Sequence, residues 1–422
     1  MHKHIWIMNH YAADMFRDKA GRHYWFARML KERGYEPRVF CANTFHSRPG
    51  AVPVGRKGYR EGTDRGIPYI FVKTVPSTGN GVDRLKNMAL FYKNLYPAAA
   101  GIAGTYGKPD VILASSVHPL TMAAGIQIAR RFRIPCICEI RDLWPEAIFT
   151  FGKVKEQSLP GRLLTAGEHW IYRNADALIF TKEGDTDYLK EKRWTTEQGG
   201  DIDLAKCHYI NNGVDLRSFQ ERMQKQVFHD ADIMSDDTFR VVYAGTIRPI
   251  NHVGNLLDAA KLIQKRPGCE DVRFLIFGDG AELPKLRERV KREQIDNVKL
   301  KGFVDRRYIP FILGRSSVNL LNYSQSQYNW SRGNSSNKLF EYMASGKPVI
   351  STVRMGYDLI ERYRCGISLE EDTPECLAEA VLAIRGMDPG SYHALCAASR
   401  RAAADFDFGV LTEKLIKVIE SV

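Results

Sequence analysis

The sequence predicts an α/β protein made of two Rossmann-like domains that face a cleft. Its 422 residues exceed what one hydrophobic core ordinarily holds, so two domains are the default expectation. Short apolar runs typical of buried parallel strands alternate with segments of helical periodicity, which is the doubly wound pattern. The alternation stops at a polar stretch over residues 218–238 and then begins again, which indicates a second domain of the same kind.

The composition fits a globular protein with an excess of basic residues. Apolar residues make up 44% of the chain and charged residues 26%, which are ordinary values. The net charge is +12, and residues 1–60 alone hold 12 Lys and Arg against 4 Asp and Glu. Such a surface suits nucleic acid, an anionic membrane or phosphorylated substrates, although a solvated basic face without a partner has the same composition.

Targeting and metal signals are missing from the sequence. The first eight residues lack the long apolar segment of a signal peptide, and no stretch approaches the roughly 18–20 apolar residues that cross a bilayer. Eight cysteines fit a reducing compartment, and no His or Cys cluster has the spacing of metal ligands. We therefore expect a cytoplasmic protein without a metal.

The first domain is expected over residues 1–205. Its first strand is followed by a loop that reaches Gly21 and by an amphipathic helix that ends near Gly34. A long loop rich in Gly and Arg is expected from Ser47 to Gly66. The expected strands are residues 5–8, 38–42, 111–114, 135–140 and 177–180.

Residues 206–238 are expected to link the domains, and residues 239–404 to form the second one. Its expected strands are residues 240–243, 274–277, 298–300, 318–321 and 348–350. Residues 405–422 are expected to form a C-terminal helix that packs back toward the first domain through one apolar face. Ligands of such sheets bind at the carboxyl ends of the strands, so motifs at those ends carry most weight.

The segment from Ser335 to Ile350 has the most informative pattern. Ser336 is placed to cap a helix that ends near Gly346. Lys338 and Glu341 are three residues apart and therefore lie on one face of that helix. A helix N-terminus with a Lys suits a diphosphate, and a Glu one turn later suits a ribose diol. The alternative is a surface Lys–Glu pair on a core helix, without a ligand.

This segment resembles the donor-binding motif of family four retaining glycosyltransferases, which have the two-domain GT-B fold and the pattern Glu-x7-Glu followed by Ala-x-Gly-x-Pro-Val. The resemblance implies that Glu341 holds the nucleotide ribose. The first Glu of the pattern, which helps to hold the donor sugar, falls at Gly333 and is absent. The version Ser-x-Asn-Lys-Leu-x-Glu-Tyr is similar to that of bacterial surface-polysaccharide enzymes resembling N-acetylfucosamine transferases. It implies donor contacts from Ser336, Asn337, Lys338 and Leu339.

Further segments of the second domain agree with the family in order and spacing. Residues 243–248 resemble the strand-end loop that grips the donor diphosphate, although the family's usual Lys falls near Asn251. Residues 276–280 are similar to the family's Gly-x-Gly, but a tight turn alone requires the same glycines. Residues 300–304 resemble the stretch that cradles the base. These segments supply the donor-site candidates Gly245, Thr246, Arg248, Gly278, Gly280 and Phe303.

Two strand ends in the first domain carry candidate catalytic residues. His118 lies between a strand and a helix, where an imidazole can hydrogen-bond a sugar hydroxyl or a phosphate. A His satisfied by its neighbours at a helix start is the alternative. Arg141 and Asp142 follow the next strand, in an Arg-Asp-Leu-Trp-Pro block that resembles the polysaccharide subgroup. An Arg–Asp pair that only stabilises the turn is the alternative for these two residues.

The resemblance implies retaining transfer of a sugar from a nucleotide-diphosphate donor to a hydroxyl of a lipid-linked or saccharide acceptor, in bacterial surface polysaccharide synthesis. It implies a UDP donor, an N-acetylated amino sugar, no cofactor, and no catalytic metal, because basic residues and helix N-termini stabilise the leaving diphosphate. No nucleic-acid partner is expected. Two alternatives share the fold: a sugar-nucleotide 2-epimerase, which lacks a broad acceptor surface, and a non-catalytic partner subunit, which binds no nucleotide.

Residues 83–96 predict an amphipathic helix that lies on a membrane surface. Arg84, Lys86 and Lys93 accompany a single acidic residue. The apolar residues at near-helical spacing are Leu85, Met88, Phe91, Tyr92 and Leu95. Such a helix can lie among anionic headgroups, so we expect peripheral binding to the inner face of the plasma membrane. The alternative is an apolar stripe packed on the domain's own sheet.

Overall fold

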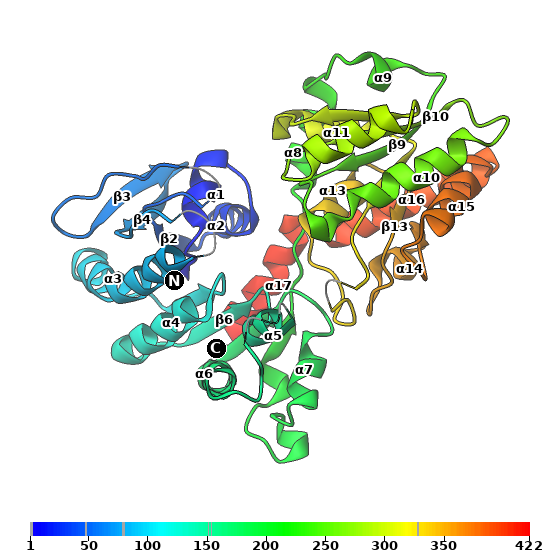
Figure 1. Ribbon diagram of the computed structural model, residues 1–422. Coiled ribbons are helices and arrows are strands. Elements are labelled where there is room, and N and C mark those ends of the chain that lie inside the picture. The colour runs from blue at the N-terminus through cyan, green and yellow to red at the C-terminus, as the bar shows by residue number, and fades with distance from the viewer. Residues whose placement is uncertain (1–2, 47–48, 78–80, 151, 153, 327–328) are drawn as a thin grey trace. The chain divides into compact units, whose positions relative to one another are not determined.

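The structure is a computed structural model that describes residues 1–422 except 1–2, 47–48, 78–80, 151, 153 and 327–328 (Figure 1). The chain divides into two compact units. Unit 1 contains residues 1–211 and 408–422, and unit 2 contains residues 212–407. Each unit has a largely parallel sheet with helices on both faces. The predicted class, two α/β domains with Rossmann-like sheets, is confirmed.

Unit 1 contains an eight-stranded sheet. Its strands are β1 (His4–Met8), β2 (Glu36–Ala42), β3 (Tyr59–Asp64), β4 (Ile67–Val72), β5 (Val111–Ser115), β6 (Cys136–Ile140), β7 (Ala177–Phe180) and β8 (Cys207–Tyr209), in the spatial order β3-β4-β2-β1-β5-β6-β7-β8. All neighbours are parallel except the antiparallel pair β3–β4. The strand order reverses between β1 and β5. The carboxyl ends of these two strands are therefore where a doubly wound sheet binds ligands.

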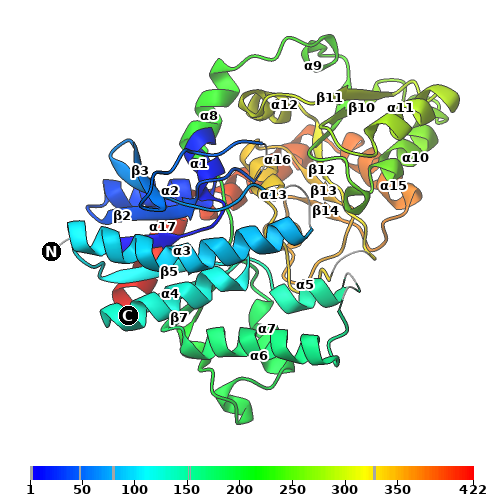
Figure 2. The ribbon, with the colours of Figure 1, turned by 60° about the vertical axis from the view of Figure 1, so that its left-hand side comes forward.

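Helices cover both faces of this sheet. They are α1 (Ala12–Asp18), α2 (Arg22–Glu32), α3 (Val82–Tyr106), α4 (Pro119–Phe132), α5 (Trp144–Thr150), α6 (Leu159–Asn174), α7 (Asp185–Glu191) and α17 (Phe408–Ser421). Helices α3, α4 and α6 lie side by side on one face (Figure 2). Their core includes Trp6, Phe40 and Phe91. On the other face α17 packs against α2, where Phe408 contacts the rings of Trp25 and Phe26.

The hairpin of β3 and β4 corrects the loop expected from Ser47 to Gly66. Residues 59–64 form an edge strand instead of loop. Arg65 and Gly66 both have positive φ, 47° and 74°, which is what a two-residue hairpin turn requires. The strand was missed because its sequence, Tyr-Arg-Glu-Gly-Thr-Asp, is polar and mostly exposed and therefore lacks an apolar run.

Unit 2 contains a six-stranded, fully parallel sheet. Its strands are β9 (Phe239–Ala244), β10 (Val272–Phe277), β11 (Val298–Gly302), β12 (Val318–Leu321), β13 (Val349–Ser351) and β14 (Gly366–Ser368), in the order β11-β10-β9-β12-β13-β14. Its helices are α8 (Leu216–Lys225), α9 (Ala231–Met234), α10 (Val253–Gln264), α11 (Leu283–Arg292), α12 (Ile309–Gly314), α13 (Asn337–Ala344), α14 (Leu359–Tyr363), α15 (Pro374–Arg385) and α16 (Pro389–Asp405). The strand order reverses between β9 and β12, which marks their carboxyl ends as the expected ligand position.

The expected linker, residues 206–238, contains β8, α8 and α9. Helix α8 begins where the Asp215 carboxylate accepts a hydrogen bond from the Ser218 N–H at 2.8 Å. Lys301 on β11 pairs with Asp230 at 2.7 Å and also contacts Asp232. This polar stretch is thus held by caps and ion pairs.

The apolar stripe predicted over residues 83–96 lies on α3 and packs mainly on the sheet. Met88, Phe91 and Leu95 are buried. Val82 and Leu85, at the start of the helix, are exposed. No helix in the described part of the chain is long and apolar enough to cross a membrane.

Candidate functional site

A cavity of about 670 Å³ lies in unit 2 at the carboxyl ends of β9 and β10 and the N-terminus of α13. Eight donor-site candidates line it: Gly245, Thr246, Gly278, Phe303, Ser336, Asn337, Lys338 and Glu341. Asp279 and Arg306 also line it. Residues from four segments far apart in the sequence therefore meet beside the reversal of strand order.

Lys338 is one of two basic side chains in this lining, the other being Arg306. Its Nζ donates a hydrogen bond to the Tyr243 hydroxyl at 3.3 Å and lies over the rings of Tyr243 and Tyr323. With the Asn251 amide oriented to satisfy both of its atoms, Oδ1 accepts from Nζ at 3.2 Å. Burial lowers the pKa of Lys338 from its usual value to about 7, while the nearby Glu341 acts in the opposite direction. A bound anion would favour the charged ammonium.

Two glycines let neighbouring loops approach each other at the cavity. A Cβ on Gly278, whose φ is 143°, would lie 1.7 Å from the carbonyl oxygen of Gly245. A Cβ on Gly280 would lie 2.1 Å from the carbonyl oxygen of Ile247. Both positions require Gly, because no side chain fits between the two backbones. The Gly-x-Gly pattern after β10 therefore brings the β10 loop against the β9 loop.

The lining of the cavity also contains an acid paired with a base, and an exposed aromatic ring. Arg306 donates to Glu341 Oε1 at 3.0 Å, and both side chains line the cavity. The Phe303 side chain is 78% exposed. An exposed aromatic face at a cavity suits stacking with a planar ring, and a carboxylate suits a diol.

Three of the donor-site candidates lie outside the cavity lining. Arg248 is exposed, Leu339 is buried in the core, and Gly280 acts through backbone packing.

Two motif positions differ from what the pattern predicts. Gly333 replaces the first motif Glu and has a φ of 95°, a conformation that L side chains rarely adopt. Ser336 occupies the N-cap position of α13, but its hydroxyl hydrogen-bonds the Tyr323 hydroxyl at 2.8 Å and does not cap the helix.

In unit 1, His118 lies at the carboxyl end of β5 but has no solvent exposure. Its Nε2 is 2.6 Å from Nδ1 of His10, in the loop after β1, and the His10 ring stacks on Phe91. Burial lowers the pKa of His118 to about 3, so the imidazole is neutral. His118 was expected to hydrogen-bond a sugar hydroxyl or a phosphate, but His10 covers it, as in the alternative of a His satisfied by its neighbours. The two rings lie at the reversal of strand order.

Arg141 and Asp142 follow β6 and form no ion pair with each other in the described part of the chain. The Arg141 N–H donates to Ser116 Oγ at 2.9 Å, and its carbonyl accepts from Thr181 Oγ1 at 3.0 Å. The Arg backbone is therefore fixed. Asp142 is exposed and lines a separate apolar pocket. The alternative of an Arg–Asp pair that stabilises the turn has no support in this geometry.

A buried charge network adjoins Arg141. Glu139, without solvent exposure, accepts from Arg22 Nε at 2.6 Å and Ser115 Oγ at 2.7 Å, and lies 2.8 Å from His23 Nε2. Burial alone would raise the pKa of Glu139, but Arg22 and His23 outweigh it and hold the pKa well below its usual value. Arg22 also donates to the Ile210 carbonyl at 2.8 Å. The network ties α2 and β6 to the chain segment that leaves unit 1.

Known structures share this architecture along the whole chain. Sucrose-phosphate synthase of Thermosynechococcus elongatus matches with a TM-score of 0.70 and 18% identity, over 99% of this chain and 98% of that one. Anabaena HepE in complex with UDP matches with a TM-score of 0.66 and 15% identity, over 100% of both chains. The structure described as "putative UDP-N-acetylglucosamine 2-epimerase from Listeria monocytogenes" also shares the fold, with a TM-score of 0.61 and 12% identity over 100% of this chain and 96% of that one.

Two family models match the sequence itself. "Glycosyl transferase 4-like domain" matches residues 22–198, and "Glycosyl transferases group 1" matches residues 238–385. The chain belongs to the GT-B glycosyltransferases. A curated relative, "Probable glycosyltransferase WbjE" of Pseudomonas aeruginosa, is 20% identical over 67% of this chain and 68% of its own length.

The glycosyltransferase has functional-site residues that sequence reasoning missed. Arg306 follows a short loop after β11 and resembles any surface Arg in the sequence. The Tyr342 hydroxyl accepts from the Ala244 N–H and donates to the Ala244 carbonyl, each at 3.1 Å, and so joins α13 to the end of β9. The only feature of the sequence that could have indicated His10 is its position directly after the first strand. Among the described residues of the glycosyltransferase, no group of three His, Cys, Asp or Glu side chains is arranged to hold a metal ion.

Proposed function

We propose that this glycosyltransferase moves a sugar, with retention of configuration, from a UDP-linked donor to a hydroxyl of a lipid-linked or saccharide acceptor in bacterial surface polysaccharide synthesis. The observation that carries the proposal is Lys338, a partly desolvated ammonium at a helix N-terminus beside the Gly245 loop. Charge on a leaving diphosphate is stabilised by such groups without a metal. The donor sugar would be an N-acetylated amino sugar, as the motif subgroup implies.

The cavity residues have distinct roles in this proposal. Lys338 and the N-terminus of α13 bind the diphosphate, Glu341 with Arg306 binds the ribose, and Phe303 stacks on the base. In the transfer, the bond from the anomeric carbon to the diphosphate oxygen breaks and the acceptor oxygen forms the new bond. The acceptor proton leaves to the diphosphate. Arg141 and Asp142 contact the acceptor or donor sugar. His118, which has no solvent exposure, is neutral and supports this edge of the sheet through its 2.6 Å contact with His10.

Calorimetry with UDP, GDP, dTDP and CDP tests the donor site. We expect UDP to bind most tightly, and Lys338→Ala to weaken it by about 1.5–3 kcal/mol, the range for hydrogen bonds to charged groups. Arg248→Ala should weaken UDP binding by the same amount, although this exposed side chain lies outside the cavity lining. Lys285→Ala removes an exposed Lys of the same unit and should change nothing. Equal UDP affinity in the wild type and Lys338→Ala would remove the diphosphate assignment.

Two alternative functions, a sugar-nucleotide 2-epimerase and a non-catalytic partner subunit, can be separated from sugar transfer by experiment. The epimerase alternative is supported by the shared fold with a UDP-N-acetylglucosamine 2-epimerase. Incubation with UDP-N-acetylglucosamine and no acceptor separates the two activities, because an epimerase forms the 2-epimer whereas a transferase leaves the sugar intact. The non-catalytic partner subunit, considered because Gly333 replaces the first Glu, binds no nucleotide in the calorimetry above.

Binding to the inner membrane face is part of the proposal. The basic residues Arg84, Lys86 and Lys93 lie on α3, which exposes Val82 and Leu85 at its start. Anionic lipid attracts such clusters, and salt screens the attraction. We expect co-sedimentation with anionic liposomes at low salt and release at high salt. Recovery in the supernatant at low salt would count against membrane docking.

A further inference from the structure

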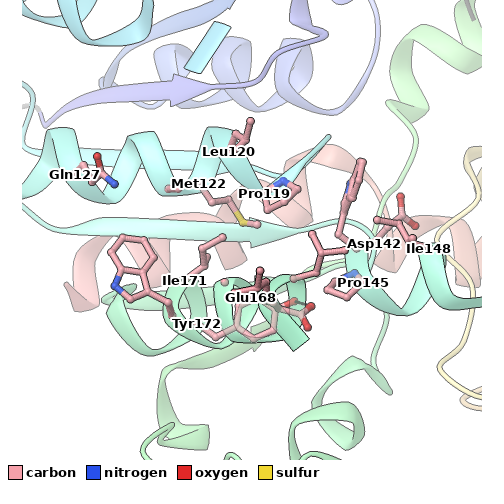
Figure 3. A pocket seen from close by; sticks show the side chains of 16 residues that line it. Pro119, Leu120, Met122, Gln127, Asp142, Pro145, Ile148, Glu168, Ile171 and Tyr172 are labelled. Carbon is pink, nitrogen blue, oxygen red and sulfur yellow. Dashed lines mark hydrogen bonds between the residues drawn. The ribbon is translucent and has the colours of Figure 1, made fainter. Parts of the chain in front are cut away.

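A groove in unit 1 lies between α4, α5 and α6, and Figure 3 shows the side chains that line it. Its volume is about 330 Å³, at the lower end of the range of roughly 300–1,000 Å³ for ligand pockets. Met122 and Ile171 lie in its wall, and Pro145 and Ile148 lie at one end. The proposed donor site, in unit 2, uses none of these residues.

The groove offers little hydrogen bonding to a ligand. The Tyr172 and Tyr188 hydroxyls each donate to the buried Glu168 carboxyl at 2.6 Å. Burial raises the pKa of Glu168 to about 7, which favours its uncharged form. The Trp144 indole N–H donates to the Val117 carbonyl at 2.8 Å. Because these polar groups already have partners, the groove suits an apolar ligand.

The groove is elongated and begins near the candidate catalytic residues. Pro119, the first residue of α4, and Asp142, just after β6, mark the end at the carboxyl edge of the sheet. Gln127, eight residues further along α4, lines the groove about 12 Å away, at 1.5 Å per residue. Leu163 on α6 lines it and is 65% exposed, so the groove opens to solvent. A linear chain fits this shape.

A basic side chain lies at the same edge of the sheet, beside the exposed Asp142. Arg141, adjacent to Asp142, forms no ion pair within the described residues, although its backbone is held on both sides. Burial lowers the pKa of Arg22, and the positive charge of Arg141 lowers it further. Glu139 compensates Arg22. The remaining charge on Arg141 favours an incoming anion.

We propose that the groove binds the apolar chain of a phosphorylated lipid acceptor and that Arg141 binds its phosphate. The inference rests on the proposed lipid-linked acceptor and specifies where the lipid lies. The chain would extend between α4 and α6, with the polar head at the carboxyl ends of β5 and β6. Burial of the chain supplies affinity in proportion to its apolar area.

Gly167 on α6 provides a direct test. It lines the groove, and a Cβ added there meets no atom within 4 Å, so a larger side chain enters open space. Leu also has a higher helix propensity than Gly, so Gly167→Leu should fold. We expect Gly167→Leu to bind farnesyl diphosphate at least tenfold more weakly than the wild type, by calorimetry on the full chain. Gly167→Ala, which leaves the groove open, should bind within about twofold, since Ala adds one methyl group.

The phosphate assignment has its own variant. Arg141→Gln should weaken farnesyl diphosphate severalfold and leave the binding of farnesol unchanged. The groove proposal is wrong if Gly167→Leu and Gly167→Ala bind farnesyl diphosphate equally, or if inorganic diphosphate binds as tightly as the farnesyl compound. UDP affinity should be the same in the wild type and in both Gly167 variants. A wild type that binds farnesyl diphosphate but no nucleotide would refute the proposed sugar transfer and leave the lipid groove standing.

Discussion

Lys338 has an environment that is unusual for a lysine. Its ammonium lies 4.9 Å from the ring centre of Tyr243 and 4.8 Å from that of Tyr323, and it forms no ion pair among the described residues. The aromatic faces attract a cation but restore only part of the hydration that burial removes. This deficit accounts for the pKa of about 7. A diphosphate at the N-terminus of α13 would compensate the charge.

We predict that donor affinity falls as the pH rises above 7. In the free protein Lys338 loses its proton near pH 7, whereas a bound diphosphate favours the ammonium and raises its pKa. Binding therefore takes up a proton above pH 7, and affinity falls by up to roughly tenfold per pH unit between pH 7 and 9. Calorimetry with UDP-glucose, whose diphosphate does not titrate in this range, measures the affinity and the proton uptake.

Lys338→Arg is the matched control, since a guanidinium keeps its charge throughout this pH range. Its donor affinity should be flat from pH 7 to 9. If the wild type shows the same flat profile and no proton uptake on binding, Lys338 is charged in the free protein and does not titrate with the donor.

At the residue scale, local patterns were predictable and distant partners were not. The spacing of Lys338 and Glu341 on one helix places both side chains at the cavity, and that spacing is visible in the sequence. His118 was found by its place after a strand, but His10, which covers it, is 108 residues away. The Tyr342 hydroxyl accepts a hydrogen bond from the backbone of Ala244, 98 residues away. Sequence spacing carries no information about such contacts.

At the scale of elements, α13 and the end of β9 are joined at the cavity that we propose as the donor site. The Tyr342 hydroxyl makes two hydrogen bonds with the backbone of Ala244, the last residue of β9. Gly245 follows at once, and a Cβ there would lie 2.8 Å from Lys338 Nζ. The position of the Lys over the loop therefore depends on this junction of helix and strand.

We predict that Tyr342→Phe destabilises unit 2 by about 2–3 kcal/mol, because it leaves a buried N–H and a buried carbonyl of Ala244 without a partner. UDP should also bind more weakly, since the Gly245 loop loses its support. Urea unfolding followed by the nucleotide titration measures both effects. Tyr308→Phe removes a hydroxyl of unit 2 that forms no hydrogen bond with the described residues, and it should change stability by less than about 0.5 kcal/mol. Equal stability of the two variants would contradict the prediction.

The predictability of elements follows their burial. The core strands β5, β7 and β12 were found from apolar runs, because both of their faces are buried. The edge strand β3 was missed, since an exposed strand needs no apolar residues. Helix α3 was found, but its packing was not determined by its pattern, because an amphipathic stripe suits a sheet and a membrane equally.

At the scale of the whole molecule, unit 1 is discontinuous in sequence. The chain leaves it after Asn211, forms unit 2, and returns at Phe408 as α17. Helix α17 packs on α2 and buries Leu411, Leu415 and Ile419. Arg33 on the same surface pairs with Glu413. Unit 1 therefore depends on a segment that the whole of unit 2, residues 212–407, separates from its main part. Unit 2 is continuous in sequence.

We predict that Leu415→Ala destabilises unit 1 and leaves donor binding in unit 2 intact. Leu415 is fully buried, and truncation of a core Leu costs about 2–5 kcal/mol. Limited proteolysis with mass spectrometry should show faster cleavage within residues 1–211, while residues 212–407 stay protected by UDP, which stabilises only the folded form that binds it. Lys414→Ala, the exposed neighbour on the same helix, should cleave like the wild type. If Leu415→Ala instead opens residues 212–407 first or loses UDP affinity, the two units do not unfold separately and α17 supports both.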